Sequence, residues 1–557
     1  MQITNDYIAD QFSLLSKLMD IHGENSFKTK SYSIAAFTLE KLPQPIQEIP
    51  SEKVTAIKGI GDAIAKKIHQ VIQTGELPLL REYIEKTPPG VIQMLRIKGL
   101  GPKKIATVWK EMEVESIGEL LYACQENRLL LYKGFGEKTQ QNVMEAIEFF
   151  LQNQGSHLYA EIEAYVQGIQ SLLEEQFPQH KTAVTGDFRR QLEVIDHLQW
   201  VTTVTPADMR SFWESKGFSP TAPETYKSPE GILLQFIHTT PEAFTTTLFT
   251  TSCSGEFLEA WQHQKGWDTS HSYPTEEAIF SAAGLPVIPP YRREQRRILD
   301  IAAQGPLPQD IRGEDIKAII HSHSNWSDGS NTLEEMAHAC IEKGYEYLVI
   351  SDHSKSAGYA NGLKEDRIKE QHHQVDELNR KLTPFTIFKS IECDILGDGT
   401  LDYTDDILST FDLVIASVHS NLKMSEEKAM ARLLKAISNP YTTLLGHMTG
   451  RLLLSRPGYS VDHKRIIEAC AEHRVVIEIN AHPRRLDMDW RWIDYALEKG
   501  VLLSIDPDAH SVEGYNVVKY GALAARKGGL TPERNLSSYG LDAFRAFLAE
   551  RRKARGI

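Results

Sequence analysis

Histidines and acidic residues recur in this sequence directly after short apolar runs, and these residue types bind divalent metals. Six histidines and three acids follow six such runs; they are His321, His323, Asp328, His353, Glu392, His419, His447, Asp508 and His510. Imidazoles and carboxylates are the ligands of Zn²⁺, Mn²⁺ and Fe ions. Nine groups exceed the need of one ion and suit two or three, with Glu392 able to bridge two of them. A lone histidine is usually an ordinary core or surface residue, but nine groups at equivalent positions favour a single site.

The runs that precede these residues alternate with segments of helical period. They span residues 316–320, 345–350, 385–391, 412–418, 442–445, 475–479 and 501–505. Apolar strands separated by helices are typical of βα units around a parallel sheet, and seven of them predict a closed or nearly closed barrel. Because the carboxyl ends of barrel strands meet on one face, we expect the nine side chains to converge there.

A second repeated pattern lies in the first 150 residues, which are predicted to be helical. Gly-apolar-Gly occurs three times before a helix with early lysines; the residues are Gly59, Gly61 and Lys67, Gly99, Gly101 and Lys103, and Gly134, Gly136 and Lys138. Such a turn leaves backbone N–H groups at a helix N-terminus available to a phosphate. One copy alone is as well explained by a plain turn between helices. Three copies within about 80 residues favour helix-hairpin-helix motifs, which bind a DNA backbone without reading its sequence.

The overall charge argues at first against a nucleic-acid partner. Lys and Arg number 61 against 75 Asp and Glu, a formal net charge of −14. Residues 51–150, however, carry 14 basic and 13 acidic residues, so DNA binding there would depend on placed amides and lysines rather than on a broad basic field. No apolar run approaches the ~18–20 residues of a membrane span. Five scattered cysteines indicate a reducing cytoplasm.

The metal-ligand motifs resemble those of the PHP (polymerase and histidinol phosphatase) domain. The resemblance rests on His321-Ser322-His323, Ser327-Asp328-Gly329, Ser351-Asp352-His353, Val418-His419-Ser420, Gly446-His447 and Asp508-Ala509-His510. Residues 446–454 and 508–511 are similar to the PHP domain that bacterial family X DNA polymerases carry at their C-terminus. The order helix-hairpin-helix, nucleotidyltransferase and PHP is also that family's, so the resemblance covers nearly the whole chain.

The resemblance implies a distorted (β/α)7 barrel with a trinuclear site. One ion would be held by His321, His323, Glu392 and Asp508. The second would be held by Glu392, His419 and His447, and the third by Asp328, His353 and His510. The implied cofactors are two or three divalent ions, Mn²⁺ or Zn²⁺ with Fe as a further option. The implied activity is metal-dependent 3′-5′ exonuclease, with abasic-site endonuclease as an additional activity.

The middle of the chain resembles the family's polymerase palm but lacks its carboxylates. Gly186-Asp187-Phe188-Arg189-Arg190 resembles the nucleotide-binding Gly-Ser-aromatic-Arg-Arg stretch, with Asp187 in place of serine. Of the three aspartates that hold Mg²⁺ in the family, only Asp196 can be matched, across a one-residue gap, and Gln235 stands at the third. A glutamine cannot supply a carboxylate's charge. We therefore expect no Mg²⁺ in the palm and no polymerase activity. The alternative is a working polymerase that uses Asp187, Glu193 and Asp196.

Lys67 stands at the position of the family's deoxyribose-phosphate lyase lysine. A lysine near DNA forms a Schiff base with an abasic sugar if its pKa is lowered. The alternative is a lysine that contacts phosphate or is merely solvated.

The predicted organisation is multidomain. Residues 1–85 form a lyase-like helical domain with the first hairpin, 86–152 a fingers-like hairpin region, 153–300 a degenerate α+β palm and thumb, 301–315 a linker, and 316–557 the PHP barrel. The predicted function is that of a monomeric DNA repair or processing enzyme of the bacterial cytosol or nucleoid, with no membrane contact. The alternatives are a bifunctional polymerase and exonuclease, a small-molecule phosphatase of the histidinol-phosphate type, and a non-catalytic DNA-binding scaffold.

Overall fold

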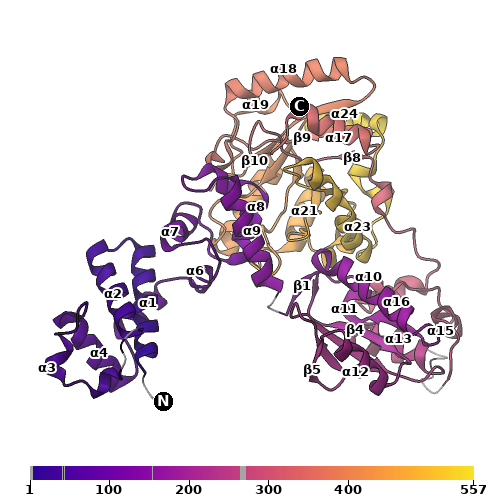
Figure 1. Cartoon of the computed structure of the whole chain (residues 1–557). Coiled ribbons are helices and arrows are strands. Elements are labelled where there is room, and N and C mark those ends of the chain that lie inside the picture. The colour runs from indigo at the N-terminus through magenta and orange to yellow at the C-terminus, as the bar shows by residue number, and fades with distance from the viewer. Residues whose placement is uncertain (1–3, 41, 43, 153–154, 264–266, 268–270) are drawn as a thin grey trace. The chain divides into compact units, whose positions relative to one another are not determined.

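The structure is a computed structural model that describes residues 4–557 except 41, 43, 153–154, 264–266 and 268–270. The chain folds into two compact units, Met1–Glu148 and Phe149–Ile557, whose elements are labelled in Figure 1. The predicted domain boundary after residue 152 adjoins residues 153–154, which lie outside the described part.

The described residues of the first unit form helices and turns, which confirms the predicted helical N-terminal region. The helices are α1 (Asn5–His22), α2 (Ser26–Glu40), α3 (Ser51–Val54), α4 (Asp62–Thr74), α5 (Pro78–Glu85), α6 (Pro89–Met94), α7 (Pro102–Lys110), α8 (Ile117–Gln125) and α9 (Glu137–Gln152), the last of which runs past the end of the unit. Local sequence explains several helix starts. Proline opens α5, α6 and α7, and Ser116 with Glu119 forms a capping box before α8.

The second unit begins with a mixed five-stranded sheet in the order β2-β4-β7-β6-β5. Its strands are β2 (Thr182–Thr185), β4 (Leu198–Thr202), β5 (Ser219–Ala222), β6 (Thr225–Lys227) and β7 (Leu233–His238). β4 runs parallel to β7, and the other neighbours pair antiparallel. A separate pair joins β1 (His157–Leu158) to β3 (Val194–Ile195). Trp200, Trp213 and Phe236 fill the core of this sheet.

Helices accompany this sheet and extend beyond it. They are α10 (Tyr159–Gln176), α11 (Gly186–Arg189), α12 (Pro206–Ser215), α13 (Phe244–Thr251), α14 (Gly255–Gln262), α15 (Glu276–Ala282) and α16 (Arg297–Ala302). A second aromatic core around Phe249, Trp261 and Phe280 holds α13, α14 and α15 together. This part is therefore mixed α/β, as the sequence predicts.

The rest of the second unit is a nearly closed barrel of seven parallel strands. They follow the order of the sequence: β8 (Ala318–Ile319), β9 (Tyr347–Ile350), β10 (Thr386–Asp394), β11 (Leu413–Ser417), β12 (Thr442–Leu445), β13 (Val476–Asn480) and β14 (Leu503–Asp506). Each lies within or next to a predicted run. The first and last strands approach just beyond their ends, where the His323 amide donates to the Ala509 carbonyl at 2.8 Å. The predicted PHP-type barrel is confirmed.

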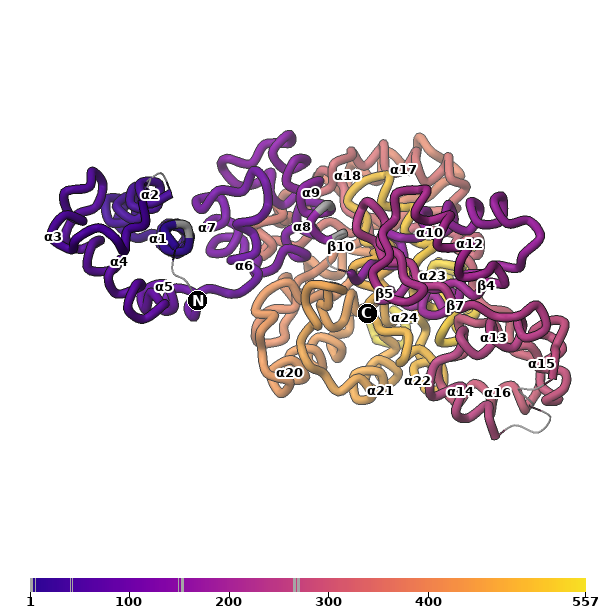
Figure 2. The backbone as a smooth tube through the Cα atoms, turned by 60° about the horizontal axis from the view of Figure 1, so that its bottom comes forward, coloured from indigo at the N-terminus to yellow at the C-terminus, as the bar shows by residue number. Residues whose placement is uncertain are grey.

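Helices follow most strands of the barrel. They are α17 (Leu333–Glu342), α18 (Glu365–Lys381), α19 (Asp405–Leu408), α20 (Glu426–Ser438), α21 (His463–His473), α22 (Ile493–Glu498), α23 (Val518–Lys527) and α24 (Leu541–Arg555); α20 and α21 lie side by side in Figure 2. Inward-facing Ile, Leu and Val of the strands and helices form a continuous core. Among the described residues, no helix has the length and apolarity that crossing a membrane requires. All five cysteines are buried and unpaired.

Candidate functional site

The structure brings all nine predicted ligands together at the carboxyl ends of the barrel strands. His321 and His323 follow β8, His353 follows β9, and Glu392 lies near the end of β10. The remaining histidines and acids follow β8, β11, β12 and β14; they are Asp328, His419, His447, Asp508 and His510. Eight of the nine are buried, and His419 is only 10% exposed. Their convergence follows from the parallel topology, which places equivalent ends of all strands on one face.

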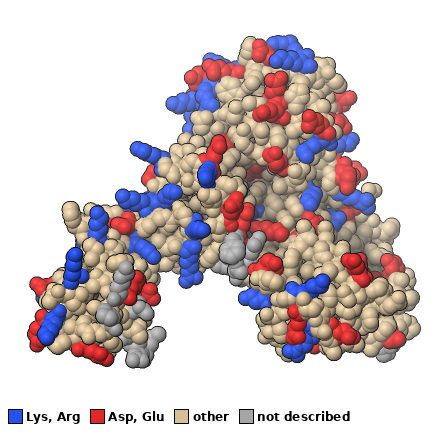
Figure 3. Space-filling view, in the orientation of Figure 1, with Lys and Arg blue, Asp and Glu red and all other residues tan. Residues whose placement is uncertain are grey.

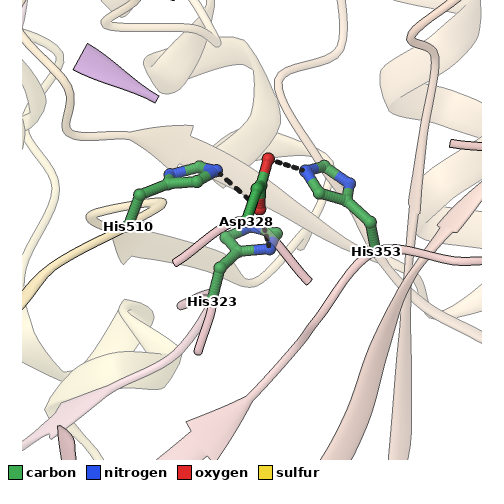
Figure 4. Close-up of side chains that lie close together, drawn as sticks. All are labelled: His323, Asp328, His353 and His510. Carbon is green, nitrogen blue, oxygen red and sulfur yellow. Dashed lines mark ion pairs between the residues drawn. The ribbon is translucent and has the colours of Figure 1, made fainter. Parts of the chain in front are cut away.

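Asp328 is the centre of the outermost group. Its carboxylate lies 3.5 Å from Nε2 of His353, 3.5 Å from Nε2 of His510 and 3.9 Å from Nδ1 of His323. Figure 4 shows the three rings converging on this carboxylate from different strands. The group contains the predicted third set of ligands and adds His323.

Glu392 is the hub of the cluster. One oxygen, Oε1, lies 2.9 Å from His447, 3.1 Å from His419 and 3.3 Å from His321. The other oxygen, Oε2, lies 3.0 Å from His353. A carboxylate that faces imidazoles from four strands has the geometry to bridge metal ions, as the sequence predicts.

Asp508 completes the innermost group with His321, His323 and Glu392, the predicted first set. Its Oδ1 lies 3.1 Å from Nε2 of His323 and 3.4 Å from Nε2 of His321. Its Oδ2 faces away and accepts a hydrogen bond from the Asn480 side chain at 3.0 Å. His321 and Asp508 have φ angles of +60° and +51°, in the left-handed region that non-glycine residues seldom adopt.

Interactions among the buried histidines and carboxylates shift several pKa values in the cluster. Burial opposes the charge of Glu392, but His419, His321 and His353 hold its pKa well below the ordinary value. Burial also works against protonation of His419, yet Glu392 and Asp394 raise its pKa to about 9. In contrast, burial together with His510 and His353 lowers the pKa of His323 to about 3. These opposed shifts show that the histidines compete for the same few carboxylates.

The donor set fits divalent ions. Several buried polar atoms that point into the cluster form no hydrogen bond with any described residue, among them Asp328 Oδ2, Glu392 Oε2 and His321 Nε2. Leaving such atoms unsatisfied in a protein interior costs about 1–3 kcal/mol each, more when charged. Ions bound between imidazole and carboxylate ligands would satisfy these atoms. The cluster is therefore compatible with metal binding.

Outer residues that the sequence analysis did not select orient these ligands. Glu478 lies 2.5 Å from Nδ1 of His321 and accepts a hydrogen bond from the His447 amide at 2.6 Å. Asp394 is bonded to Nδ1 of His419. A carboxylate on the far ring nitrogen fixes the orientation of a ligating histidine. The available signal was a charged residue inside an otherwise apolar strand, as Glu478 is in β13.

Asp352, which stands next to His353, is not directed into the cluster. It accepts hydrogen bonds from the amides of Ser324 and Ser327, at 2.9 and 3.1 Å, and from the Gln371 side chain at 2.7 Å. Asp352 thereby holds the loop between His323 and Asp328.

The palm motif residues lie together, but their charges are satisfied within the protein. Arg189 makes a two-pronged ion pair with Glu276, at 2.6 and 3.0 Å. Arg190 pairs with Asp187 at 2.7 Å and with Glu294 at 3.0 Å. Gly186, which opens α11, has a φ of +62° that favours glycine.

Two glutamines occupy the place on the palm sheet where carboxylates are expected. Gln199 of β4 and Gln235 of β7 are register partners, and their side chains are hydrogen-bonded at 2.8 Å. Asp196, the one aspartate matched from the sequence, lies on the connection before β4 and is bonded to Ser156 at 2.8 Å. Strand pairing, which the sequence alone did not show, therefore sets Gln199 opposite Gln235.

The three glycine turns of the first unit have the same backbone geometry. The first glycines, Gly59, Gly99 and Gly134, have φ angles of +97°, +93° and +96°. The apolar residues between the glycines are buried, and their amides close a turn to the residue three earlier. The second glycines directly precede α4, α7 and α9. Three equivalent turns, each opening a helix, are the geometry of the helix-hairpin-helix.

Lysines accompany each of these turns. Lys103 and Lys138 are exposed in the first turns of α7 and α9, and Lys67 is half-buried on α4. An exposed lysine that the sequence analysis did not select also precedes the first glycine of every copy; these are Lys58, Lys98 and Lys133. On the face shown in Figure 3, basic and acidic side chains are interspersed, which agrees with local rather than broad positive charge.

Three regions of the chain match known protein families. A helix-hairpin-helix domain matches residues 3–77, a SAM-like helix-hairpin-helix tandem matches residues 91–148, and a PHP domain matches residues 320–482. These matches confirm the predicted hairpin regions and the PHP barrel.

Individual relatives cover different shares of the chain. The chain is 32% identical to the DNA polymerase/3′-5′ exonuclease PolX of Bacillus subtilis over 561 residues, which span 95% of this chain and 96% of that protein. A probable phosphatase of Caldanaerobacter subterraneus subsp. tengcongensis is 28% identical over 254 residues, 42% of this chain and 92% of that protein. A probable phosphatase of Vibrio atlanticus is 26% identical over 210 residues, 35% of this chain and 79% of that protein.

Proposed function

The chain belongs to the PolX family of DNA polymerase/3′-5′ exonucleases, and from this membership we propose that its barrel is a metal-dependent phosphodiesterase that removes nucleotides from DNA 3′ ends. Membership makes the chain an enzyme that acts on DNA. The observation that carries the finer proposal is the cluster of Glu392 with the eight other predicted ligands, in which several buried polar atoms form no hydrogen bond with any described residue. The three hairpins supply the grip on DNA that a small-molecule enzyme does not need.

The proposed ions are two or three, Mn²⁺ or Zn²⁺ with Fe as a further option, held by the nine residues named above. Such ions lower the pKa of a bound water and offset the charge of the attacked phosphate. The protein's own part is orientation. Glu478 and Asp394 hold the Nδ1 atoms of His321 and His419, so that both Nε2 atoms face Glu392. Asn480 holds Oδ2 of Asp508 and leaves Oδ1 toward the histidines.

The decisive experiment is exonuclease assay of the purified full chain and its His323→Ala variant on a 3′-recessed duplex. His323 faces two of the ligand groups, so we expect the variant to lose activity and bound metal while keeping its unfolding temperature within a few degrees. A variant with full activity, in a preparation free of contaminating nuclease, would falsify the assignment. The same assay on a duplex with an abasic site tests the endonuclease activity.

We further propose that the palm has no polymerase activity and holds no Mg²⁺. One support is the Gln199–Gln235 pair, which carries no charge. The other is the ion pair of Arg189 with Glu276, because this guanidinium is then not available to a phosphate. Primer extension by the His323→Ala variant, with Mg²⁺ or Mn²⁺ present, tests this proposal. Any templated incorporation would instead support a bifunctional polymerase and exonuclease.

A phosphatase of the histidinol-phosphate type is the second candidate, favoured by the probable phosphatases that match 35–42% of the chain. Hydrolysis of histidinol phosphate, measured beside the DNA substrates, separates the two. We propose DNA as the substrate because the hairpins belong to the same chain. We also propose that the chain acts as a monomer and binds the DNA backbone without sequence preference.

Lys67 is proposed to contact phosphate rather than to act as a lyase nucleophile. It is half-buried in the second turn of α4, beyond the amides of the first hairpin. Borohydride trapping on an abasic duplex, compared between the wild-type chain and Lys67→Ala, is expected to give no adduct specific to Lys67.

A further inference from the structure

The palm turn at residues 186–193 and the barrel loop at residues 482–491 are bonded to each other. Glu193 accepts hydrogen bonds from the Trp490 indole at 3.0 Å and from Arg491 at 2.8 Å. On α10, which lies near α23 in Figure 1, Glu161 accepts from Arg484 at 2.7 Å. Side chains of α23 hold the same palm turn: Lys527 donates to the Arg190 carbonyl at 2.6 Å, and Arg526 to Gln191 at 2.7 Å.

Each of the two ion pairs joins a buried side chain to an exposed one, because Glu161 is 42% exposed and Arg491 is 45% exposed. Arg484 is 2% exposed, Glu193 is 11% exposed and the Lys527 side chain is fully enclosed. Burial opposes the charge of Glu193, but Arg491 keeps its pKa below the ordinary value. A buried ion pair that loses one partner leaves an uncompensated charge, which costs far more than losing an exposed pair.

The barrel loop reaches from the palm to the metal cluster. Arg484 faces the palm, and the next residue, Arg485, places Nε 3.7 Å from Oδ2 of Asp508. That oxygen is the one Asn480 also holds, so both side chains act on the outer face of a predicted ligand. The Arg485 amide donates to the His482 carbonyl at 2.7 Å, which keeps the loop tight beside the cluster.

A second route joins the same two places through side chains. Arg491, which pairs with Glu193, also lies 3.0 Å from Asp489. Asp489 pairs with Arg451 at 2.5 Å, and Arg451 donates from Nε to the Arg485 carbonyl at 2.8 Å. The chain of contacts therefore runs from the palm turn to the backbone of the residue beside Asp508.

We propose that the palm serves the nuclease as a clamp, in which Glu161 and Glu193 hold residues 482–491 and thereby position Arg485 against Asp508. The inference rests on the proposed nuclease function and gives the palm a role that requires no polymerase carboxylates. Glu161 and Glu193 are positioning residues, since they touch the loop and not the cluster. The clamp sets the geometry of one metal ligand and with it the affinity for the ion that Asp508 would hold.

The test compares full-length Glu161→Gln/Glu193→Gln with a matched control, Glu163→Gln. Glu163 lies on the same helix as Glu161 and also bonds to the barrel, through Lys519 at 2.9 Å, but it does not touch residues 482–491. The readouts are amide hydrogen exchange of residues 482–491, the Mn²⁺ dissociation constant by calorimetry, and exonuclease kcat and KM. We expect faster exchange, Mn²⁺ binding weaker by about 2- to 30-fold, and a fall in kcat with KM nearly unchanged. The control should match the wild-type chain.

Adding Arg485→Met to both backgrounds identifies the route. If the clamp acts through Arg485, the two glutamine substitutions cause no further loss of Mn²⁺ affinity once Arg485 is replaced. The proposal is overturned if the glutamine substitutions weaken Mn²⁺ binding equally with and without Arg485. It is also overturned if Glu161→Gln/Glu193→Gln keeps the hydrogen exchange and the Mn²⁺ affinity of the wild-type chain. If the double substitution impairs folding, the single variants Glu161→Gln and Glu193→Gln carry the same test. A wild-type chain without exonuclease activity would defeat the proposed function, while exchange and Mn²⁺ affinity would still decide the clamp.

Discussion

The barrel and the palm sheet both place polar side chains on neighbouring parallel strands, yet these side chains differ in how completely they are hydrogen-bonded. In the barrel, Glu392 faces five imidazoles, and buried atoms around it form no hydrogen bond with the residues described. In the palm sheet, Gln199 and Gln235 complete each other's bonding at 2.8 Å. A cluster of carboxylates and imidazoles that leaves buried polar atoms without hydrogen bonds gains free energy by binding a cation, whereas a neutral, bonded pair gains none. Polar residues at strand ends therefore indicate a metal site only when the contacts among them leave such atoms without hydrogen bonds.

The first prediction has the largest expected effect and concerns the metal-ligand cluster of the barrel. Glu392→Gln keeps the shape of the side chain but removes the charge that five histidines share. We expect exonuclease activity to fall about a thousandfold or more, equivalent to ~4 kcal/mol of lost charge stabilisation. Bound metal, measured by elemental analysis, should fall in parallel.

Asp394→Asn is the graded control for Glu392→Gln. Asp394 lies two residues along the same strand, bonds to the far nitrogen of His419 and accepts a hydrogen bond from the Ser356 hydroxyl at 2.7 Å. Loss of an outer partner of this kind typically costs about 10–100-fold. If Glu392→Gln were milder than Asp394→Asn, Glu392 would not be the hub of the site.

The second prediction tests the palm side by introducing the missing charges. In Gln199→Asp/Gln235→Asp, two carboxylates replace a hydrogen-bonded amide pair, and their repulsion should lower stability by about 2–4 kcal/mol. Millimolar Mg²⁺ should restore part of the loss if the sheet retains the geometry of a metal site. Thermal unfolding with and without Mg²⁺ provides the measurement.

The matched control for the palm is Gln199→Asn/Gln235→Asn, which shortens both side chains without adding charge. It should be destabilised less and should not respond to Mg²⁺. If Mg²⁺ stabilised the aspartate and asparagine variants equally, the ion would bind elsewhere in the protein. The palm would then lack the geometry of a metal site as well as the charge.

The barrel could be predicted from sequence because its signals are local. Each strand is an apolar run of about five residues, and each ligand follows its run directly, so topology alone brought His321 and Asp508 together across 187 positions of sequence. The partners that orient the ligands carry no such signal. Glu478 lies within β13, and its bond to His321 depends on the order of strands around the barrel.

The palm was harder to predict because its relevant pairs depend on strand register. Asp196, which resembles a family aspartate only across a one-residue gap, lies before β4, whereas Gln199 lies within it. Only the pairing of β4 with β7 sets Gln199 against Gln235. The contacts of Glu193 with Trp490 and Arg491 join residues about 300 positions apart and have no repeating pattern that a sequence could reveal.

The third prediction concerns pH and applies to the barrel alone. Against burial, Glu392 and Asp394 raise the pKa of His419 to about 9, so in chelator-treated protein this ring carries a proton at neutral pH. A metal needs the neutral imidazole and must displace that proton. The proton released from His419 should therefore contribute an increase in Mn²⁺ affinity of up to about tenfold per pH unit between pH 6.5 and 8.5, and this contribution should level off above pH 9.

Calorimetry in two buffers of different ionisation enthalpy checks this sign, because the released proton adds the buffer's heat to the signal. Asp394→Asn removes one of the two carboxylates that raise the pKa, so the plateau should begin at lower pH in that variant. Affinity that rises as the pH falls would contradict the assignment of His419 as a ligand.

The smallest expected effect concerns the hairpins, whose proposed DNA binding is the same whether the barrel or the palm is the active part. Lys103 is exposed in the first turn of α7, beside the amides that follow Gly101, whereas Lys110 lies at the other end of the same helix. If the hairpin holds a phosphate, Lys103→Ala should weaken binding to random-sequence duplex several-fold and reduce the salt slope of log Kd by about one. Lys110→Ala should change both less, because seven residues of helix place it about 10 Å away. Fluorescence anisotropy across a range of salt concentrations measures both quantities. If the salt slope of log Kd were equal for the two variants, the lysines would contribute only general positive charge. The backbone amides of the glycine turns would then make the specific contacts with the DNA phosphates.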